Sequence, residues 1–328
     1  QAGQRIADLL GAESGIVTPG AAAALMLGSA ASVAGTDGTV SERLPDVSGL
    51  ASKVLIQSGH RYKYDRQISM TGAELVEVGS ANGTRPDQIE EAVDDDTAMV
   101  LYPAHKESKP GSVPLATVAE ITRRKGVPLF VDAAFMSYPL DVLPGFLEQG
   151  ADLVAVSAKY FGGPNAGGFI VGRAALIEAV RNVYFTRYES GAYLKYGRPL
   201  KMDRHTVVAV VTAFEDWLSM DHDERLAAWR TRTELLASEL GGLGGVTPKP
   251  MYFTLDERVV DEPVNCVVLE FDSNSASSAD RLARDLAAED PQILTIAEGE
   301  ILLVVVEEMT DEETRYVAGR IRALVNAS

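Results

Sequence analysis

The stretch ADLVAVSAKYFGGPNAGGFIVGR, residues 151–173, decides the fold. It begins with a short apolar run at 153–156 that predicts a strand, and Ser157 and Lys159 follow at the strand's carboxyl end. Several glycines come next and allow a ligand to approach the backbone closely. Because ligands bind at the carboxyl ends of strands in an open α/β sheet, Lys159 is a candidate covalent amine. Taken alone, the segment equally fits a surface lysine in a glycine-rich loop.

A second predicted strand, residues 129–131, delivers Asp132 to the same edge of the sheet. The chain between Asp132 and Lys159 is long enough for one crossover helix and a return strand. An acid and a lysine at one rim suit pyridoxal phosphate (PLP), because the lysine binds the cofactor covalently and the acid keeps the pyridine nitrogen protonated. An Asp after a strand is also commonly a helix cap or a turn former.

The segment TPGAAAAL, residues 18–25, predicts a tight turn that leads into an alanine-rich helix. Free amides at a helix N-terminus form a seat for phosphate that needs no cationic side chain. Many buried helices begin in this way. The order of the three motifs, which runs from this turn to Asp132 and then to Ser157-x-Lys159, favours a PLP site.

With these motifs the chain resembles PLP enzymes of fold type I, in the aminotransferase class V-like branch that holds bacterial selenocysteine synthase and D-glucosaminate-6-phosphate ammonia-lyase. The resemblance runs through GAESGIVTPGAAAAL, SGHRYKYDRQI, VPLFVDAA, GADLVAVSAK and the GRPLK segment at 197–201. It implies an α/β fold with a mostly parallel, seven-stranded type of sheet between helices, and a small C-terminal α/β domain.

Residue by residue, the resemblance implies that Lys159 carries the cofactor and that Asp132 partners the pyridine nitrogen. It assigns the cofactor phosphate to one side chain and three backbone amides: Ser157, Gly20, Ala21 and Ala22.

Three further positions match less closely. His60 corresponds to the histidine that stacks on the cofactor ring in the more distant cysteine desulfurases. Phe135 stands where desulfurases have a glutamine that contacts the ring hydroxyl, so that contact either comes from another residue, for which His105 is the candidate, or is absent. Asn165 replaces the Gln of close relatives.

Composition narrows the class of protein. The chain has 328 residues, 46% of them hydrophobic, which suffices for more than one domain, and no apolar run is long enough to predict a membrane span. The net charge of −17 repels phosphate backbones, so we expect no nucleic-acid partner and disfavour tRNA as a substrate. The single cysteine, Cys266, predicts a structural thiol in a reducing, cytoplasmic compartment.

Alternating strands and helices predict a PLP-binding domain over 1–202. An apolar stripe predicts one helix from Asp203 to about Leu240, in a linking segment at 203–245, and a small domain follows at 246–328. Residues 61–72 also have helical character. The chain begins without Met inside a helix-like segment, and we expect an N-terminal segment to be missing.

Residues 184–201 concentrate cations in an acidic chain, namely Arg187, Lys195, Arg198 and Lys201. Such a patch predicts a site for an anionic substrate group, with Arg198 and Lys201 as its ligands. Aromatic residues interleave with the cations, which also fits a subunit interface. Both interpretations hold if the protein is a homodimer, or a higher homo-oligomer, whose active sites lie at the subunit interface.

The leading functional hypothesis is a PLP-dependent lyase that removes the α-proton of a small anionic amino acid and expels a β-substituent, as in the ammonia-lyase. Racemases, aminotransferases and aldolases share the same carbanion and remain alternatives. Selenocysteine synthase and a non-catalytic protein of this fold are disfavoured, the latter because Lys159 and Asp132 are both present. A nicotinamide enzyme would need a G-x-G-x-x-G motif near residues 15–30, and none stands there. We expect no metal.

Overall fold

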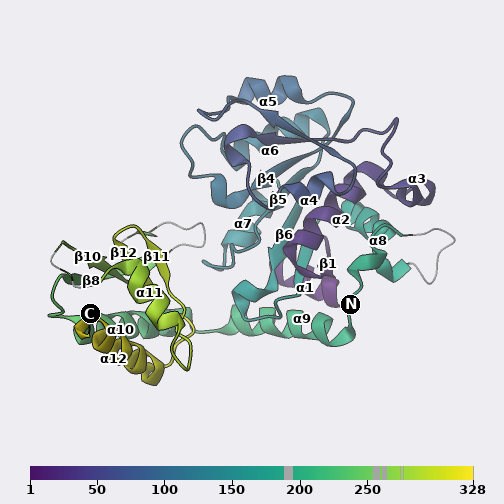
Figure 1. Ribbon diagram of the computed structural model, residues 1–328. Coiled ribbons are helices and arrows are strands. Elements are labelled where there is room, and N and C mark those ends of the chain that lie inside the picture. The colour runs from purple at the N-terminus through teal and green to yellow at the C-terminus, as the bar shows by residue number, and fades with distance from the viewer. Residues whose placement is uncertain (188–194, 254–258, 261–263, 274, 276, 328) are drawn as a thin grey trace. The chain divides into compact units, whose positions relative to one another are not determined.

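The computed structural model describes residues 1–187, 195–253, 259–260, 264–273, 275 and 277–327. The chain divides into two compact units, Gln1–Ser219 and Met220–Ser328 (Figure 1). The hydrophobic core of each unit is its own.

The first unit is built on a seven-stranded sheet in the order β1-β7-β6-β5-β4-β2-β3. Its β7 is antiparallel to both neighbours, and the other pairs are parallel. This mostly parallel sheet confirms the predicted fold class. The strands are β1 (Ser14–Thr18), β2 (Lys53–Gln57), β3 (Glu74–Val78), β4 (Thr97–Pro103), β5 (Leu129–Asp132), β6 (Leu153–Ser157) and β7 (Gly168–Gly172).

Helices pack against this sheet. They are α1 (Ala2–Leu10), α2 (Gly20–Ala34), α3 (Gly38–Arg43), α4 (Arg66–Ser69), α5 (Pro86–Ala92), α6 (Leu115–Lys125), α7 (Val142–Glu148), α8 (Ala174–Val183) and α9 (Arg204–Ser219). Short 3-10 turns, η1 (Ser58–His60), η2 (Ala104–Lys106), η3 (Ala158–Phe161), η4 (Phe185–Arg187) and η5 (Arg198–Leu200), follow several of the strands and helices.

Helix α2 is buried along most of its length, which explains its composition of alanine, glycine and leucine. At Gly28 a Cβ atom would lie 2.2 Å from the Phe130 ring of β5, so only glycine lets the helix come this close to the sheet. This close packing fixes the position of the N-terminal end of α2 over the strands that carry the candidate site.

The second unit is an α/β layer. Its five-stranded antiparallel sheet has the order β11-β12-β10-β8-β9, and helices α10, α11 and α12 complete the unit. The elements are α10 (His222–Leu240), β8 (Val246–Phe253), β9 (Val259–Val260), β10 (Cys266–Phe271), α11 (Ala279–Ala287), β11 (Ile296–Glu298), β12 (Ile301–Val305) and α12 (Asp311–Asn326).

Cys266 lies in the middle of this sheet and is fully buried. Its thiol donates to the carbonyl of Met251 at 3.3 Å, and burial raises its pKa to about 12. A thiol in this state is a poor nucleophile, which agrees with the structural role predicted for it.

Two predicted helices differ from the structure. The single helix from Asp203 to about Leu240 is wrong: α9 ends at Ser219, and Asp221 starts α10 by accepting a hydrogen bond from the Glu224 amide at 2.9 Å. This N-cap outweighs the continuous apolar stripe. The helical segment at 61–72 shrinks to α4, because the Asp65 carboxylate accepts from the Tyr62 amide and pairs with Arg61.

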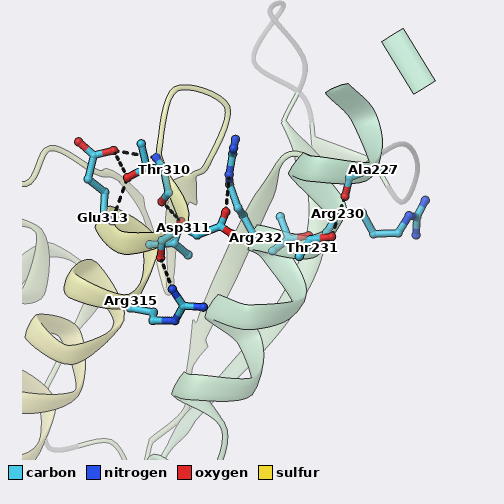
Figure 2. A network of polar contacts seen from close by, with 10 residues as sticks. Ala227, Arg230, Thr231, Arg232, Thr310, Asp311, Glu313 and Arg315 are labelled. Carbon is cyan, nitrogen blue, oxygen red and sulfur yellow. Dashed lines mark hydrogen bonds and ion pairs between the residues drawn. The ribbon is translucent and has the colours of Figure 1, made fainter. Parts of the chain in front are cut away.

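The N-terminus of α12 is fixed against α10 by a network of polar contacts (Figure 2). Thr310 and Glu313 form a capping box, in which each side chain accepts from the other residue's amide, at 2.7 and 3.2 Å. The Arg232 guanidinium on α10 lies 3.1 Å from the carboxylate of Asp311. These contacts are largely exposed, so they orient the helix more than they stabilise the unit.

Within the described residues, no helix is both long and apolar enough to cross a membrane.

Candidate active site

The strand register brings the predicted motifs to one edge of the large sheet. Gly168, the first residue of β7, pairs with Thr18 at the end of β1 and with Ser157 at the end of β6. In the next strand Asp132 pairs with Ala155 of β6. We call the turn at residues 18–20, which precedes α2, the phosphate turn. This turn, Ser157 and Asp132 therefore lie along the same rim of four adjacent strands.

The phosphate turn is held against the start of β7 by close backbone packing. A Cβ atom on Gly168 would lie 2.6 Å from the Val156 carbonyl oxygen and 2.9 Å from the Gly20 backbone, so this position requires glycine. Gly20 has a φ of 84°, which also favours glycine. Pro19 provides no side-chain cap for α2, so the amides of Gly20 and the next two alanines keep their capacity to bind an anion.

Asp132 is 3% exposed and lies at the carboxyl end of β5. Its Oδ1 accepts from the Ala134 amide at 3.0 Å and its Oδ2 accepts from the Tyr62 hydroxyl. Burial raises the pKa of this carboxyl, and the two hydrogen bonds oppose the increase. Within the described residues Asp132 has no ion pair, so a cationic ligand group would relieve its burial.

Tyr62 is a site residue that the sequence reasoning missed. Its hydroxyl donates to Asp132, and burial, followed by the charge of Asp132, raises its pKa well above the usual value. The Tyr62 backbone amide donates to the Asp65 carboxylate at 3.1 Å. The one sequence signal was an aromatic residue two positions after His60, in the segment that the resemblance had already marked.

His60 is fully buried, and its ring meets the edge of Tyr102 with centroids 5.1 Å apart. Ser112 donates its hydroxyl hydrogen to the Lys106 carbonyl at 3.1 Å, so Ser112 Oγ must accept at 2.9 Å from a protonated His60 Nε2. This fixes the tautomer and leaves His60 Nδ1 unprotonated and without a partner. Stacking of His60 on a cofactor ring stays a prediction, and in this structure Tyr62 is the ring that lies beside the acid.

The environment of His60 predicts a pH dependence of folding. Burial, followed by the charges of His105, Lys109 and Lys106, lowers its pKa from 6.5 to about 4. The unfolded chain takes up this proton first as the pH falls, so the stabilisation is complete above pH 6.5 and is lost by pH 4, a change of about 3 kcal/mol.

His60→Asn should remove this part of the pH dependence. The free energy of unfolding of the cofactor-free protein, measured by denaturant titration at pH 7.5 and pH 5, tests it. The exposed His205, replaced in the same way, serves as the control and should leave the dependence as in the wild type. An unchanged pH dependence in His60→Asn would contradict the burial argument.

A row of aromatic rings connects Asp132 with Lys159. The Tyr62 ring meets His105 at 5.3 Å, His105 meets Phe135 at 5.1 Å, and Phe135 meets Tyr160 at 5.8 Å between centroids. The half-buried His105 thus reaches the site as predicted for a cofactor contact, although its role stays a prediction. The rings are inclined to one another by 46° to 67°, so the row offers weakly polar ring faces and edges against which a heterocycle can pack.

Lys159 lies in η3, directly after β6, and its amine is 4.7 Å from the centroid of the Tyr160 ring. The side chain is exposed, and within the described residues no carboxylate pairs with it. The amine is therefore accessible for covalent chemistry at the rim that carries Asp132 and Ser157.

The basic segment runs beside this rim. Lys195 is buried and donates to Asn182 at 3.3 Å, close to the C-terminal end of α2 and away from the phosphate turn. Further along, the Tyr184 hydroxyl lies 2.8 Å from the Val17 carbonyl of β1 and 3.2 Å from the Met202 sulfur. The segment therefore ends next to the strand that leads into the phosphate turn.

Arg198 and Lys201 lie between these two anchors. Arg198 is half-buried in η5 and Lys201 is exposed. Residues 188–194 of the basic segment, and the side chain of Arg187, lie outside the described residues.

Solved structures share this architecture. A D-glucosaminate-6-phosphate ammonia-lyase superposes with a TM-score of 0.85 at 22% identity, covering 99% of this chain and 85% of its own. A serine palmitoyltransferase from S. paucimobilis with bound PLP superposes with a TM-score of 0.55 at 15% identity, covering 99% of this chain and 75% of its own. Fold and site together define a PLP-dependent enzyme of fold type I. The chain belongs to the L-seryl-tRNA selenium transferase (SelA) family, whose model matches residues 2–189.

The relatives of this chain carry the names of different enzyme activities. A 5'-C-glycyluridine monooxygenase-decarboxylase from a Streptomyces species is 32% identical over 76% of this chain and 61% of its own length. The D-glucosaminate-6-phosphate ammonia lyase of Salmonella typhimurium is 28% identical over 73% of this chain and 70% of its own. An L-seryl-tRNA(Sec) selenium transferase from Desulfomicrobium baculatum is 26% identical over 97% of this chain and 70% of its own. The chain thus spans about two thirds of the length of these relatives.

The residues present fit PLP. Among the residues that the structure describes, no cation pairs with the buried Asp132 carboxylate, and a protonated pyridine nitrogen would supply one. The glycine-lined turn before α2 offers amides to a phosphate. Asp132 would hold the ring nitrogen, Ser157 and the amides of α2 the phosphate, and Lys159 the covalent bond. When bound, PLP supplies an electron sink for the electron pair left at a substrate's Cα.

Proposed function

We propose that the enzyme is an ammonia-lyase that acts on a small, anionic 2-amino-3-hydroxy acid. The observation that carries this proposal is the placement of the Lys159 amine and the Asp132 carboxylate on adjoining strand ends, neither of them in an ion pair with any described residue. The likeness to the Salmonella ammonia lyase supports the reaction type. The net change is loss of water across C2 and C3 and hydrolysis of the C2–N bond, which gives a 3-deoxy-2-oxo acid and ammonia.

In this scheme Lys159 removes the Cα proton and later returns a proton to the substrate carbon chain. Asp132 would hold the protonated ring nitrogen with its charged carboxylate, and the Tyr62 hydroxyl and the Ala134 amide hold its two oxygens in place. The aromatic row from Tyr62 to Tyr160 shields this region from water, which strengthens the electrostatic interactions within it.

The substrate is proposed to be a small molecule rather than a charged tRNA. Some relatives are named for tRNA, but a net charge of −17 opposes a polyanion, while a short cationic segment can still concentrate a single carboxylate or phosphate. We further propose that the protein is an intracellular homo-oligomer and that the cationic segment, residues 184–201, lies close to a subunit interface.

A second candidate is supported by the 32% identity to the monooxygenase-decarboxylase. Loss of CO2 from an amino acid also leaves an electron pair at Cα, and O2 would then be the oxidant. The two candidates differ in their products. Incubation of the holoenzyme with amino acids, amino-sugar acids and glycyl nucleosides should release ammonia and a 2-oxo acid without O2 uptake. Release of CO2 with O2 consumption would favour the second candidate instead.

Arg198 is predicted to bind the α-carboxylate of the substrate, because it lies in GRPLK, the segment directly before Met202, which shares with Val17 of β1 a contact to the Tyr184 hydroxyl. A bidentate, charge-assisted contact is worth roughly 1.5 to 3 kcal/mol, and Lys cannot reproduce its geometry. Arg198→Lys should raise KM about 10- to 100-fold and leave the absorbance spectrum of bound PLP intact.

Lys201→Arg, three residues further along the chain, keeps the positive charge at the other predicted ligand and should change KM little. If Arg198→Lys instead fails to form the oligomer, the residue belongs to a subunit interface. Loss of PLP with an unchanged KM would place it at the cofactor phosphate.

A further inference from the structure

The loop between β4 and α6 carries a second group of cations, on the side of the site away from the phosphate turn. We propose that Lys106 and Lys109 in this loop bind a second, distal anionic group of the substrate, a phosphate monoester. The proposal rests on the proposed function, because it extends the substrate to an amino acid with a carboxylate at one end and a phosphate at the other.

The loop is held rigidly at the end of β2. The Gln57 side chain donates to the Val113 carbonyl at 3.0 Å and accepts from its amide at 2.8 Å, as a neighbouring strand would. Ser112 links His60 to the Lys106 carbonyl. A loop fixed in this way presents its side chains in one arrangement, so a ligand does not have to order it.

The loop from Ala104 to Pro114 carries two lysines and one carboxylate. The loop's own carboxylate, Glu107, is committed elsewhere, because its Oε1 accepts from the Leu115 amide at 2.9 Å. Lys109 donates one hydrogen bond, to the Gly59 carbonyl at 2.9 Å, and keeps two N–H groups. Among the described residues none forms a hydrogen bond or ion pair with the Lys106 amine.

Both lysines lie next to His60. The Lys109 amine bonds the carbonyl of Gly59, the residue before His60, and Ser112 links the Lys106 carbonyl to the His60 ring. Burial, and then the charges of His105, Lys109 and Lys106, lowers the pKa of His60, which agrees with this placement. His105 in turn contacts Tyr62, whose hydroxyl binds Asp132. His105 and Tyr62 thus lie between Lys106 and the acid that would hold the cofactor.

The two anion sites lie on opposite sides of that acid. The phosphate turn belongs to β1, β7 and β6. The Lys106–Lys109 loop follows β4 and is bonded to the end of β2, and β5 with Asp132 lies between the two sites. Two strand spacings, about 10 Å, separate β5 from β2. An extended six-carbon amino-sugar acid phosphorylated at its far end spans this distance, so the cofactor phosphate and a substrate phosphate would not compete.

The first test needs no turnover. The holoenzyme is treated with an acetylating reagent in inorganic phosphate or in chloride of equal ionic strength, and each lysine is quantified by mass spectrometry. Phosphate should slow the modification of Lys106 and Lys109 at least about threefold. Lys125 and Lys63, both exposed, are controls and should react equally in the two salts. Equal rates at Lys106 and Lys109 would overturn the site.

The second test compares two substrates, a phosphorylated amino-sugar acid and its dephosphorylated form. Lys106→Met and Lys109→Met should each raise KM for the phosphorylated substrate about tenfold or more, with little change for the other substrate or in kcat. Lys63→Met is the matched control, and Lys106→Arg should recover most of the affinity. An equal rise in KM for both substrates would contradict a phosphate site. If the wild type turns over neither, the proposed function fails, and the acetylation pattern alone decides the anion site.

Discussion

Lys159→Ala should abolish covalent attachment of PLP and lower turnover by at least about 10³-fold, because the same amine binds the cofactor and moves the Cα proton. In the wild type, borohydride reduction of the purified holoenzyme should fix the cofactor on Lys159, as read by peptide mass spectrometry. The amine is exposed at the rim next to Tyr160, and no carboxylate pairs with it in the described residues.

Lys53 is the matched control for this experiment. It belongs to the same sheet but lies at the start of a strand, β2, and its amine pairs with Asp94 at 2.7 Å and Asp96 at 3.2 Å. Lys53→Ala should keep the bound cofactor and its turnover. Recovery of the reduced cofactor on Lys53, Lys106 or Lys201 would overturn the assignment of Lys159.

Asp132→Asn should retain PLP and lose roughly 10²- to 10³-fold of turnover, because a neutral amide cannot hold the ring nitrogen protonated. The cofactor-free variant should be at least as stable as the wild type at pH 8. The raised pKa means that the folded protein binds this proton more tightly than the unfolded chain does. The charged carboxyl therefore costs stability increasingly as the pH rises above its unfolded value.

Asp152→Asn provides the comparison for this variant. Asp152 precedes β6 at the opposite edge of the sheet, where its carboxylate accepts from the Leu129 amide at 2.8 Å and pairs with Arg173 at 3.1 Å. Its replacement should lower stability and leave kcat unchanged. Near-normal turnover in Asp132→Asn would show that the reaction does not depend on a protonated ring nitrogen.

The rim of the site could be predicted from the sequence because its residues come directly after predicted strands. Short apolar runs marked β5 and β6, and the polar residue after each run identified Asp132 and Ser157 as neighbours. The parallel class of the sheet followed from the alternation of strands and helices, and the structure confirms it.

The contacts missed by sequence reasoning are those made between distant segments. Nothing in the residues around Tyr62 shows that its hydroxyl reaches Asp132, since this depends on the Asp65 turn that replaces the expected helix. The burial of His60 depends on a loop that begins after β4. The break between α9 and α10 was visible only as an Asp after Ser219 and Met220, a cap signal weaker than the apolar stripe around it.

The position of β7 has a consequence for biosynthesis. The first strand of the sheet to leave the ribosome is β1, and its neighbour in the described sheet is β7, the last strand of that sheet to be made. The phosphate turn encoded near the start of the chain is therefore closed only when Gly168 arrives between Thr18 and Ser157. A nascent or truncated polypeptide that ends before Gly168 would carry Asp132 and Lys159 and still be unable to hold the coenzyme. Coenzyme uptake thus reports that translation has passed the whole sheet.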